Sequence, residues 1–223
     1  MDPLAGSQWS QPGVVAGFST SAPNPELMQY ARRVSASGSC LRALDIGCGA
    51  GRNAVPLALS GCKVIGTDLS WPMLQAAAAR DSAGRLQVAL APMQRLPVRD
   101  RSVDLVIAHG IWNLARSGDE FRRAVAEGAR AAKPGGRLFV FTFSRHTLPD
   151  NAEPVAGEEF VFTQFSGSPQ VFLTGEQLLD AMHEAEFDPD PDLPLREYNL
   201  PPPGQVRMAG PPVIYEAGFR FRK

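Results

Sequence analysis

Apolar residues along most of the chain form short runs separated by amphipathic segments. Nearly continuous apolar runs, which predict buried strands, occupy residues 41–46, 63–67, 86–90, 103–108 and 137–143. The segments around them predict helices over residues 25–35, 52–59, 71–80 and 119–132. Strands that alternate with helices favour parallel pairing through right-handed crossovers. The pattern therefore predicts a doubly wound α/β sheet.

The C-terminal third follows a different pattern. Residues 144–173 contain prolines, glycines, acids and four phenylalanines, which predicts an inserted lid or an extra hairpin. A helix is expected over residues 174–186, with Thr174 as its N-cap, and Ser70 is expected to cap helix 71–80. Two closing strands are expected over residues 195–200 and 213–222. No repeat or linker divides the chain, so residues 1–223 are predicted to form a single domain.

Residues 1–23 form an N-terminal arm rich in Gly, Ser, Pro and Gln, with isolated aromatic residues. This composition predicts irregular structure and allows two interpretations. The arm is either a disordered tail or a flap that orders over bound ligands.

A glycine-rich turn follows the first predicted strand, in the sequence Asp45-Ile46-Gly47-Cys48-Gly49-Ala50-Gly51. The next strand ends at Asp68, 23 residues after Asp45. Parallel strands end at one edge of a sheet, so both carboxylates are expected beside the turn, as in a nucleoside-cofactor site. A dinucleotide fingerprint needs a third glycine where this chain has Arg52, and a Walker loop needs a Gly-Lys-Ser/Thr sequence that is absent.

Several further motifs occur in a fixed order. They include Val64-Ile65-Gly66-Thr67-Asp68-Leu69-Ser70, Leu96-Pro97-Val98 before Ser102-Val103-Asp104-Leu105-Val106, and Lys133-Pro134-Gly135-Gly136. With the glycine turn, they make residues 41–143 resemble the class I S-adenosylmethionine-dependent methyltransferases. The resemblance implies a Rossmann-like, seven-stranded, mostly parallel sheet with helices on both faces and a C-terminal antiparallel hairpin. It also implies S-adenosylmethionine as cofactor.

The resemblance assigns cofactor contacts to Asp45, Gly47, Cys48, Gly49, Asp68, Leu69, Met93, Gln94 and His109. Asp45 is expected near the methionine ammonium group, and Asp68 is expected to accept hydrogen bonds from the ribose hydroxyls. The family often has an acid where this chain has Pro92, so adenine recognition is expected from the amide of Met93 or from Gln94.

The methyl acceptor is expected beside the end of the fourth strand. His109 is the candidate general base, with a wall residue or a cofactor contact as its alternative role. Trp112, Asn113 and Tyr30 are candidate acceptor-binding residues, although Trp112 can equally serve packing. Methyl transfer from a sulfonium needs no base when the acceptor arrives as a competent nucleophile. No motif indicates O, N, S or C methylation.

Composition narrows the range of partners. The net charge is −1 and no basic run exceeds two residues, so a small-molecule acceptor is favoured over nucleic acid. No signal peptide or membrane segment is recognisable, and the three cysteines lack metal-ligand spacing, which favours a cytoplasmic protein without a metal. The alternatives are a nucleic-acid methyltransferase, a non-catalytic cofactor-binding domain and a nicotinamide dehydrogenase. The Gly51-Arg52-Asn53 sequence also resembles small methyltransferases of thiols, thiopurines or tellurite, and the oligomeric state stays open.

Overall fold

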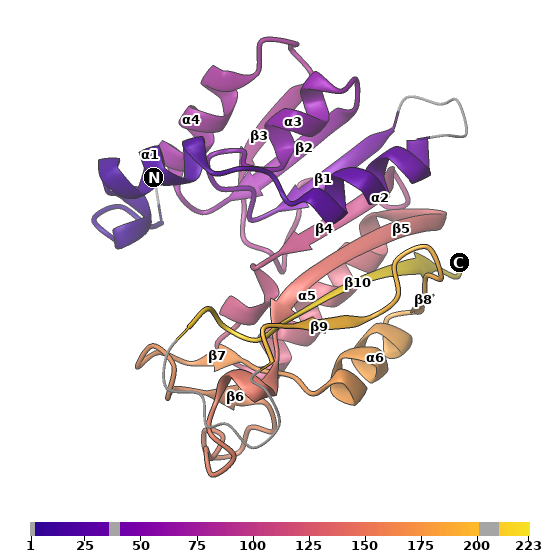
Figure 1. Ribbon diagram of the computed structural model, residues 1–223. Coiled ribbons are helices and arrows are strands. Elements are labelled where there is room, and N and C mark those ends of the chain that lie inside the picture. Colours follow the sequence, from indigo (N-terminus) through magenta and orange to yellow (C-terminus); the bar gives the residue numbers. More distant parts are fainter. Residues whose placement is uncertain (1–2, 36–40, 201–209) are drawn as a thin grey trace.

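The computed structural model describes residues 3–35, 41–200 and 210–223 and contains one large sheet (Figure 1). Its eight strands are β1 (Arg42–Ile46), β2 (Lys63–Asp68), β3 (Leu86–Leu90), β4 (Val103–His109), β5 (Ala132–Phe143), β8 (Phe187–Pro189), β9 (Arg196–Tyr198) and β10 (Ile214–Phe221). The helices are α1 (Pro12–Thr20), α2 (Pro25–Ser35), α3 (Ala54–Leu59), α4 (Trp71–Arg80), α5 (Gly118–Ala131) and α6 (Gly175–Glu184).

The sheet has the order β3-β2-β1-β4-β5-β10-β8, and β9 pairs with the free part of β10. Strands β1 to β5 are parallel, and β10 is antiparallel to β5, β8 and β9. The chain order therefore reverses between β1 and β4, which are neighbours. This arrangement confirms the predicted Rossmann-like sheet with its C-terminal antiparallel hairpin, and the sheet contains one strand more than expected.

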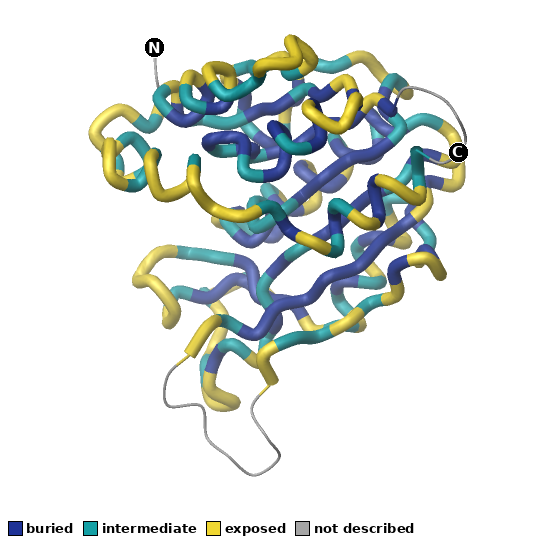
Figure 2. The backbone as a smooth tube through the Cα atoms, turned by 45° about the horizontal axis from the view of Figure 1, so that its top comes forward, coloured by how far each residue is buried: buried dark blue, intermediate teal, exposed yellow. Residues whose placement is uncertain are grey.

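Helices cover both faces of the sheet. Helices α2, α3 and α4 pack on one face over a cluster that includes Ala43, Ile107 and Phe139, and α5 and α6 pack on the other over Leu44, Val106 and Val140. The strands form the buried centre, and the exposed segments lie mainly in loops (Figure 2). Burial on both faces explains why these strands appear in the sequence as continuous apolar runs.

The largest differences from the predicted strands are an earlier start of β5 and the additional strand β8. Strand β5 begins at Ala132, before the expected start at 137, because Ala132 pairs with Val103 across a register shift around the Lys133–Gly136 turn. Strand β8 was not predicted, because it is three residues long and contains only Phe187 as an apolar residue. It forms where Glu186 adopts a positive φ of 66° and turns the chain back toward β10.

The N-terminal arm is largely helical, so the prediction of irregular structure is wrong for residues 8–20. A 3₁₀ turn at Gln8–Ser10 precedes α1, and Pro12 begins α1, where its missing N–H costs no hydrogen bond. Helix α1 has no buried residue. Without an apolar face turned to the core, it gives little of the periodic signal that would predict a helix.

Residues 144–173 contain the short strands β6 (Val161–Phe162) and β7 (Gln170–Val171), which form an antiparallel pair. This is the extra hairpin that the sequence allowed, and its role as a lid stays a prediction. The following helix α6 begins with Thr174 as N-cap in a complete capping box with Gln177. That cap confirms the predicted start of the helix.

Two features are absent from the part of the chain that the structure describes. Across residues 3–35, 41–200 and 210–223, no helix is long and apolar enough to cross a bilayer. The same residues contain no group of three or more His, Cys, Asp or Glu side chains placed to bind a metal ion.

Candidate functional site

The turn after β1 requires glycine at several positions. Gly47, Gly49 and Gly51 have φ values of 67°, 53° and 78°, in the left-handed region that other residues rarely adopt. A Cβ on Gly47 would lie 2.6 Å from Ile111, and one on Gly51 would lie 2.6 Å from Val55. The turn therefore brings bare backbone to the edge of the sheet, as a tightly approaching ligand requires.

Asp68 at the end of β2 is bonded directly to this turn. Its Oδ2 accepts the backbone N–H of Gly49 at 2.9 Å, and its Oδ1 accepts the N–H of Ser70 at 2.8 Å. Each carboxylate oxygen has two acceptor positions, so hydroxyl donors can still bind. The carboxylate thus lies beside the turn, oriented by two backbone donors.

Asp45 at the end of β1 is the other acid of the site and is buried, with 2% of its surface exposed. Its Oδ2 has no hydrogen-bond partner. Burial, and secondly the charge of Asp68, raise the pKa of Asp45 to about 7, although a backbone hydrogen bond from Ala54 opposes the shift. A buried acceptor without a partner fits a cationic donor, such as an ammonium group, at this position.

Cys48 contributes backbone rather than thiol to the turn. Its N–H donates to Thr67 O at 2.8 Å, and a Cβ on Gly66 would lie 2.7 Å from its Sγ. Burial raises the pKa of the thiol well above its ordinary value. The side chain therefore packs against β2 as an uncharged group.

The predicted adenine contacts lie beyond Asp68. Leu69 is half-buried and Met93 is almost fully buried, while Gln94 donates through Nε2 to Glu120 at 3.3 Å. Gln94 is thus already engaged with α5.

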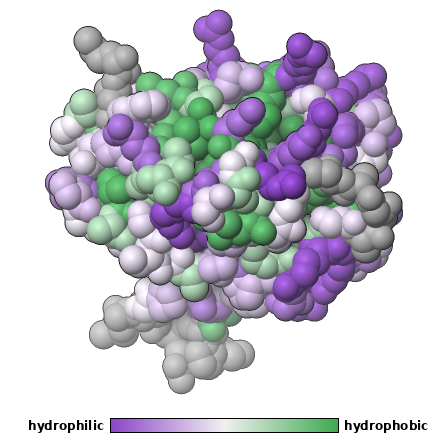
Figure 3. All heavy atoms as spheres, turned by 90° about the horizontal axis from the view of Figure 1, so that it is seen from above, coloured by the Kyte–Doolittle hydropathy of each residue, from purple (hydrophilic) through white to green (hydrophobic). Residues whose placement is uncertain are grey.

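Sequence reasoning missed an exposed apolar surface next to Asp68. Leu90 on β3 is the register partner of Asp68 and is 37% exposed, and Trp71 at the start of α4 is 46% exposed. Figure 3 shows hydrophobic patches among hydrophilic side chains on the surface seen from above. The exposure of Trp71 and Leu90 could not be inferred from the sequence, where Trp71 looks like an ordinary core residue of an amphipathic helix.

His109 lies beside the glycine turn, because Ile46 pairs with Ala108 on the adjacent strand. Its ring stacks on Phe141 with centroids 4.4 Å apart. Burial, and secondly the charge of Arg52, lower the pKa of His109 to about 4, against a smaller contribution from its own backbone. An imidazole with this pKa is a weak proton acceptor at neutral pH, so the geometry favours the wall role over the base role.

Asn24 joins these elements, and the sequence did not mark it. Its backbone N–H donates to Asn53 Oδ1 at 3.0 Å, and its side-chain Nδ2 lies 2.6 Å from Glu216 Oε1 and 3.2 Å from His109 Nε2. Its Oδ1 accepts the N–H of Leu27 at 3.0 Å and so caps α2. The Asn24-Pro25 sequence is a local signal for a helix start. The contact with Glu216 has no local signal, because the two residues are 192 positions apart.

The three predicted acceptor-binding residues are not brought together. Tyr30 is buried on α2, and its hydroxyl donates to Asp190 at 2.7 Å. Trp112 is buried on the opposite face of the sheet, in the same core cluster as Phe121, and its ring meets Phe121 edge-on. Asn113 is 2% exposed, and its Oδ1 is buried without a partner.

The N-terminal arm lies over the glycine turn. A Cβ on Gly49 would lie 3.8 Å from the Phe18 ring, and Ser70 Oγ donates to the carbonyl of Trp9 at 3.0 Å. Arg52 Nε donates to Ala22 O at 2.6 Å. The arm is therefore seated against the edge where both acids lie, and helix α1 lies close to α4 (Figure 1).

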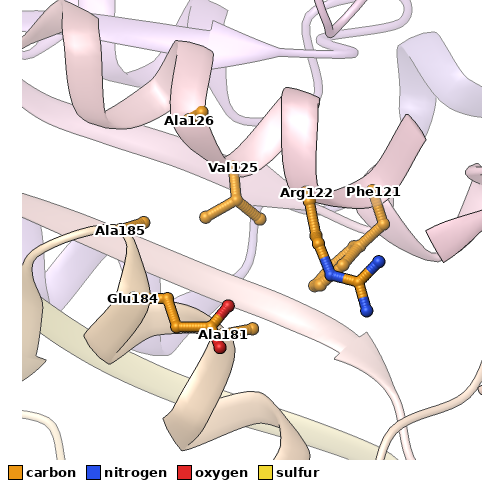
Figure 4. Close-up of a pocket in the computed structure, with 7 residues that line it drawn as sticks. All are labelled: Phe121, Arg122, Val125, Ala126, Ala181, Glu184 and Ala185. Carbon is orange, nitrogen blue, oxygen red and sulfur yellow. The ribbon is translucent and has the colours of Figure 1, made fainter. Parts of the chain in front are cut away.

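A groove on the other side of the sheet lies far from these residues in the fold. It runs between α5 and α6 and is lined by Phe121, Arg122, Val125, Ala126, Ala181, Glu184 and Ala185 (Figure 4). It contains no residue of the glycine turn. The site at the strand ends is therefore the one with the residues for cofactor chemistry.

The region around the glycine turn is similar in sequence to known methyltransferases. The sequence model of a family described as a methyltransferase domain matches residues 44–140. A demethylmenaquinone methyltransferase of Corynebacterium urealyticum is 35% identical over 109 residues, which make up 48% of this chain and 44% of that protein. The chain therefore covers less than half the length of the curated relatives that it matches.

Solved structures share the fold over most of the chain. An S-adenosylmethionine-dependent methyltransferase of Methanosarcina mazei has a TM-score of 0.70 at 19% identity, covering 90% of this chain and 99% of that one. A 1,6-didemethyltoxoflavin-N1-methyltransferase of Burkholderia thailandensis, with 1,6-didemethyltoxoflavin and S-adenosylhomocysteine bound, has a TM-score of 0.65 at 18% identity. That match covers 89% of this chain and 79% of the other. These likenesses agree with the fold described above.

Proposed function

We propose that this chain transfers the methyl group of S-adenosylmethionine to a small-molecule acceptor, because residues 44–140 match a methyltransferase-domain family and the fold is similar to that of S-adenosylmethionine-dependent methyltransferases. The observation that carries the proposal is the arrangement around the glycine turn. Asp68 is bonded to Gly49 of the turn, and Asp45 presents an unpartnered buried oxygen at the next strand end.

Each part of this edge suits one part of the cofactor. Asp68 accepts hydrogen bonds from the ribose hydroxyls, and Asp45 accepts a hydrogen bond from the ammonium group. The glycine turn has no side chains in the way, so the part of the cofactor between these two groups can lie against its backbone. Exposed apolar surface at Trp71 and Leu90 offers a face for the adenine ring. The arm then covers the ligand through Phe18, which lies closest to Gly49.

When bound, S-adenosylmethionine would supply an activated methyl group: the acceptor would form a bond to the methyl carbon as the methyl–sulfur bond breaks, with S-adenosylhomocysteine as the leaving group. The chain's part is to orient the acceptor and to exclude water, and effective molarity alone can contribute about 7–11 kcal/mol. His109 forms a wall beside the turn, and no side chain is assigned as base. An acceptor that is already a good nucleophile, or that loses its proton to water, suits this arrangement.

The proposed class of methyl acceptor is supported by the net charge of the chain and by the substrates for which its relatives are named. The net charge of −1 provides no general attraction to nucleic acid. The curated relatives are named for quinone substrates and one structural neighbour for a heteroaromatic one. We therefore place small aromatic and quinone compounds first among the acceptors, with thiols next.

A radiolabel assay tests the proposal. Purified protein is incubated with S-adenosylmethionine carrying a labelled methyl group and with separate panels of quinones, heteroaromatic compounds, thiols, transfer RNA and DNA. The proposal predicts label in at least one small-molecule panel. Label confined to nucleic acid would contradict the small-molecule assignment, and tight cofactor binding without transfer to any panel would favour a non-catalytic cofactor-binding domain.

A further inference from the structure

The amide of Asn24 has a fixed orientation. Its Oδ1 accepts the N–H of Leu27 at the start of α2, so the carbonyl end of the amide faces the helix. Its Nδ2 must then face the other way, where Glu216 Oε1 lies at 2.6 Å and His109 Nε2 at 3.2 Å. An amide nitrogen has two hydrogens, one for each of these partners.

This orientation determines the state of the histidine. An amide nitrogen only donates, so Nε2 of His109 must accept and therefore carries no proton. The single proton of the neutral ring is then on Nδ1. Protonation of Nε2 would place two donors against each other.

Glu216 holds the donor in place from the far side. It lies on β10, opposite Phe141 on β5, which itself lies opposite His109 on β4, so the three residues form one row across the sheet. Glu216 is buried, and burial raises its pKa while the hydrogen bond from Asn24 opposes that shift. A buried carboxyl bonded to one amide hydrogen leaves the second hydrogen to point at the ring.

From this geometry we propose that Asn24, held by Glu216, is a positioning residue that keeps His109 uncharged in the Nδ1–H form. The charged groups facing this cluster are Arg52 beside the ring and Glu26 near Glu216. The inference deepens the proposed function, because a neutral ring beside the glycine turn does not repel a sulfonium ion. An imidazolium at the same place would do so.

The test exchanges the two side chains. In the double variant Asn24→Asp with Glu216→Gln, the net charge and the helix cap are both kept, because aspartate also caps helices. A carboxylate then faces Nε2 and accepts instead of donating. Long-range ¹H–¹⁵N NMR spectra of the protein without ligand report which ring nitrogen is protonated, and His109→Gln identifies the signals among the three histidines.

Wild-type protein should show His109 neutral and protonated on Nδ1 from about pH 8 to below about pH 6. In the exchanged variant, Nε2 should gain a proton, and the titration midpoint should rise by at least about one pH unit. Glu216→Gln alone still offers a carbonyl to the Asn24 amide, so its His109 spectrum should match wild type.

Two results would overturn the proposal: an Nε2–H ring in the wild type, or an exchanged variant with the wild-type ring state and midpoint. Circular dichroism checks that the variants fold.

If the exchanged variant does not fold, Asn24→Ser provides a second test. Serine keeps the helix cap but has no amide to reach the ring, so this variant should show both ring forms. An unchanged single form in that variant would equally contradict the proposal. Because the spectra need no ligand, they can fail independently of methyl transfer.

Discussion

The backbone N–H of Gly49 donates to Oδ2 of Asp68 across 2.9 Å and joins the ends of β1 and β2. The bond fixes the carboxylate beside the glycine turn before any ligand binds. A preorganised acceptor loses little freedom when hydroxyl groups arrive, which favours tight binding. The proposed cofactor site, made of Asp45, the glycine turn 47–51 and Asp68, is therefore assembled from two neighbouring strands rather than from one motif.

Alanine at Gly47 or Gly51 should destabilise the fold and abolish cofactor binding. Both positions have positive φ, and both would place a Cβ 2.6 Å from a neighbouring side chain. The backbone cost is about 1–2 kcal/mol, and overpacking adds about 1–3 kcal/mol. Gly61→Ala is the matched control, because its φ is 102° with open space around it. Thermal unfolding should show a larger loss of stability in the Gly47 and Gly51 variants than in the Gly61 variant. Equal losses of stability in all three variants would contradict the steric argument.

Asp45 should make stability and cofactor affinity depend on pH in opposite directions. Its pKa is raised to about 7 from 3.8, so the fold favours the protonated form and loses stability as the pH rises through this window. The loss amounts to about 1.4 kcal/mol for each pH unit. An ammonium group favours the ionised form, so cofactor affinity should rise over the same window.

Denaturant unfolding at about pH 5 and about pH 8 measures this effect against Asp45→Asn, which cannot ionise. The wild type should lose stability relative to the variant at the higher pH, and calorimetry should show that only the wild type gains affinity. Parallel behaviour of the two proteins would mean that Asp45 does not titrate in this range.

Tyr30→Phe should lower stability without changing cofactor or acceptor affinity. Its buried hydroxyl donates to Asp190, which also pairs with Arg137 and Arg220. Loss of a hydrogen bond to a charged group costs about 1.5–3 kcal/mol. Tyr198→Phe on β9, whose ring is only half-buried, is the matched control. A selective loss of acceptor binding in the Tyr30 variant would return this residue to the acceptor site.

Phe18→Ala should speed both entry and escape of the cofactor. The ring is the part of the arm nearest Gly49, and α1 has no buried residue to hold it in place. We expect the association and dissociation rates for S-adenosylhomocysteine to rise by about threefold to tenfold in stopped-flow fluorescence. Leu59→Ala, which removes an exposed apolar side chain from α3, should leave both rates unchanged. Unchanged rates in the Phe18 variant would show that the arm does not gate the site.

Local patterns predicted where the residues of the proposed cofactor site lie, because these residues lie at or directly after the strand ends. Asp45 and Asp68 are fixed by the apolar runs before them, and β1 and β2 are adjacent as parallel pairing requires. The capping of α6 by Thr174 was equally local and is confirmed. The prediction that the Ser70 side chain caps α4 is wrong. Its hydroxyl donates to the carbonyl of Trp9 in the arm and makes no cap bond to α4.

What the sequence could not predict depends on long-range contacts. The Asn24 side chain reaches Glu216 on the last strand, and no pattern around either residue indicates this. Tyr30 and Trp112 looked like acceptor ligands because aromatic residues serve both cores and pockets, and only packing separates the two roles. The low pKa of His109 arises from burial, which likewise depends on the whole fold.

The most direct measurement is calorimetric titration of wild-type protein and of Asp68→Asn with S-adenosylmethionine and with NAD. The account predicts that wild type binds S-adenosylmethionine and not NAD, and that the variant binds it about 10-fold to 100-fold more weakly, as expected for lost charge-assisted hydrogen bonds. Asp81→Asn is the matched control, because Asp81 also accepts two backbone N–H groups but lies away from the turn. Undiminished affinity in the Asp68 variant, or binding of NAD alone by the wild type, would contradict the account.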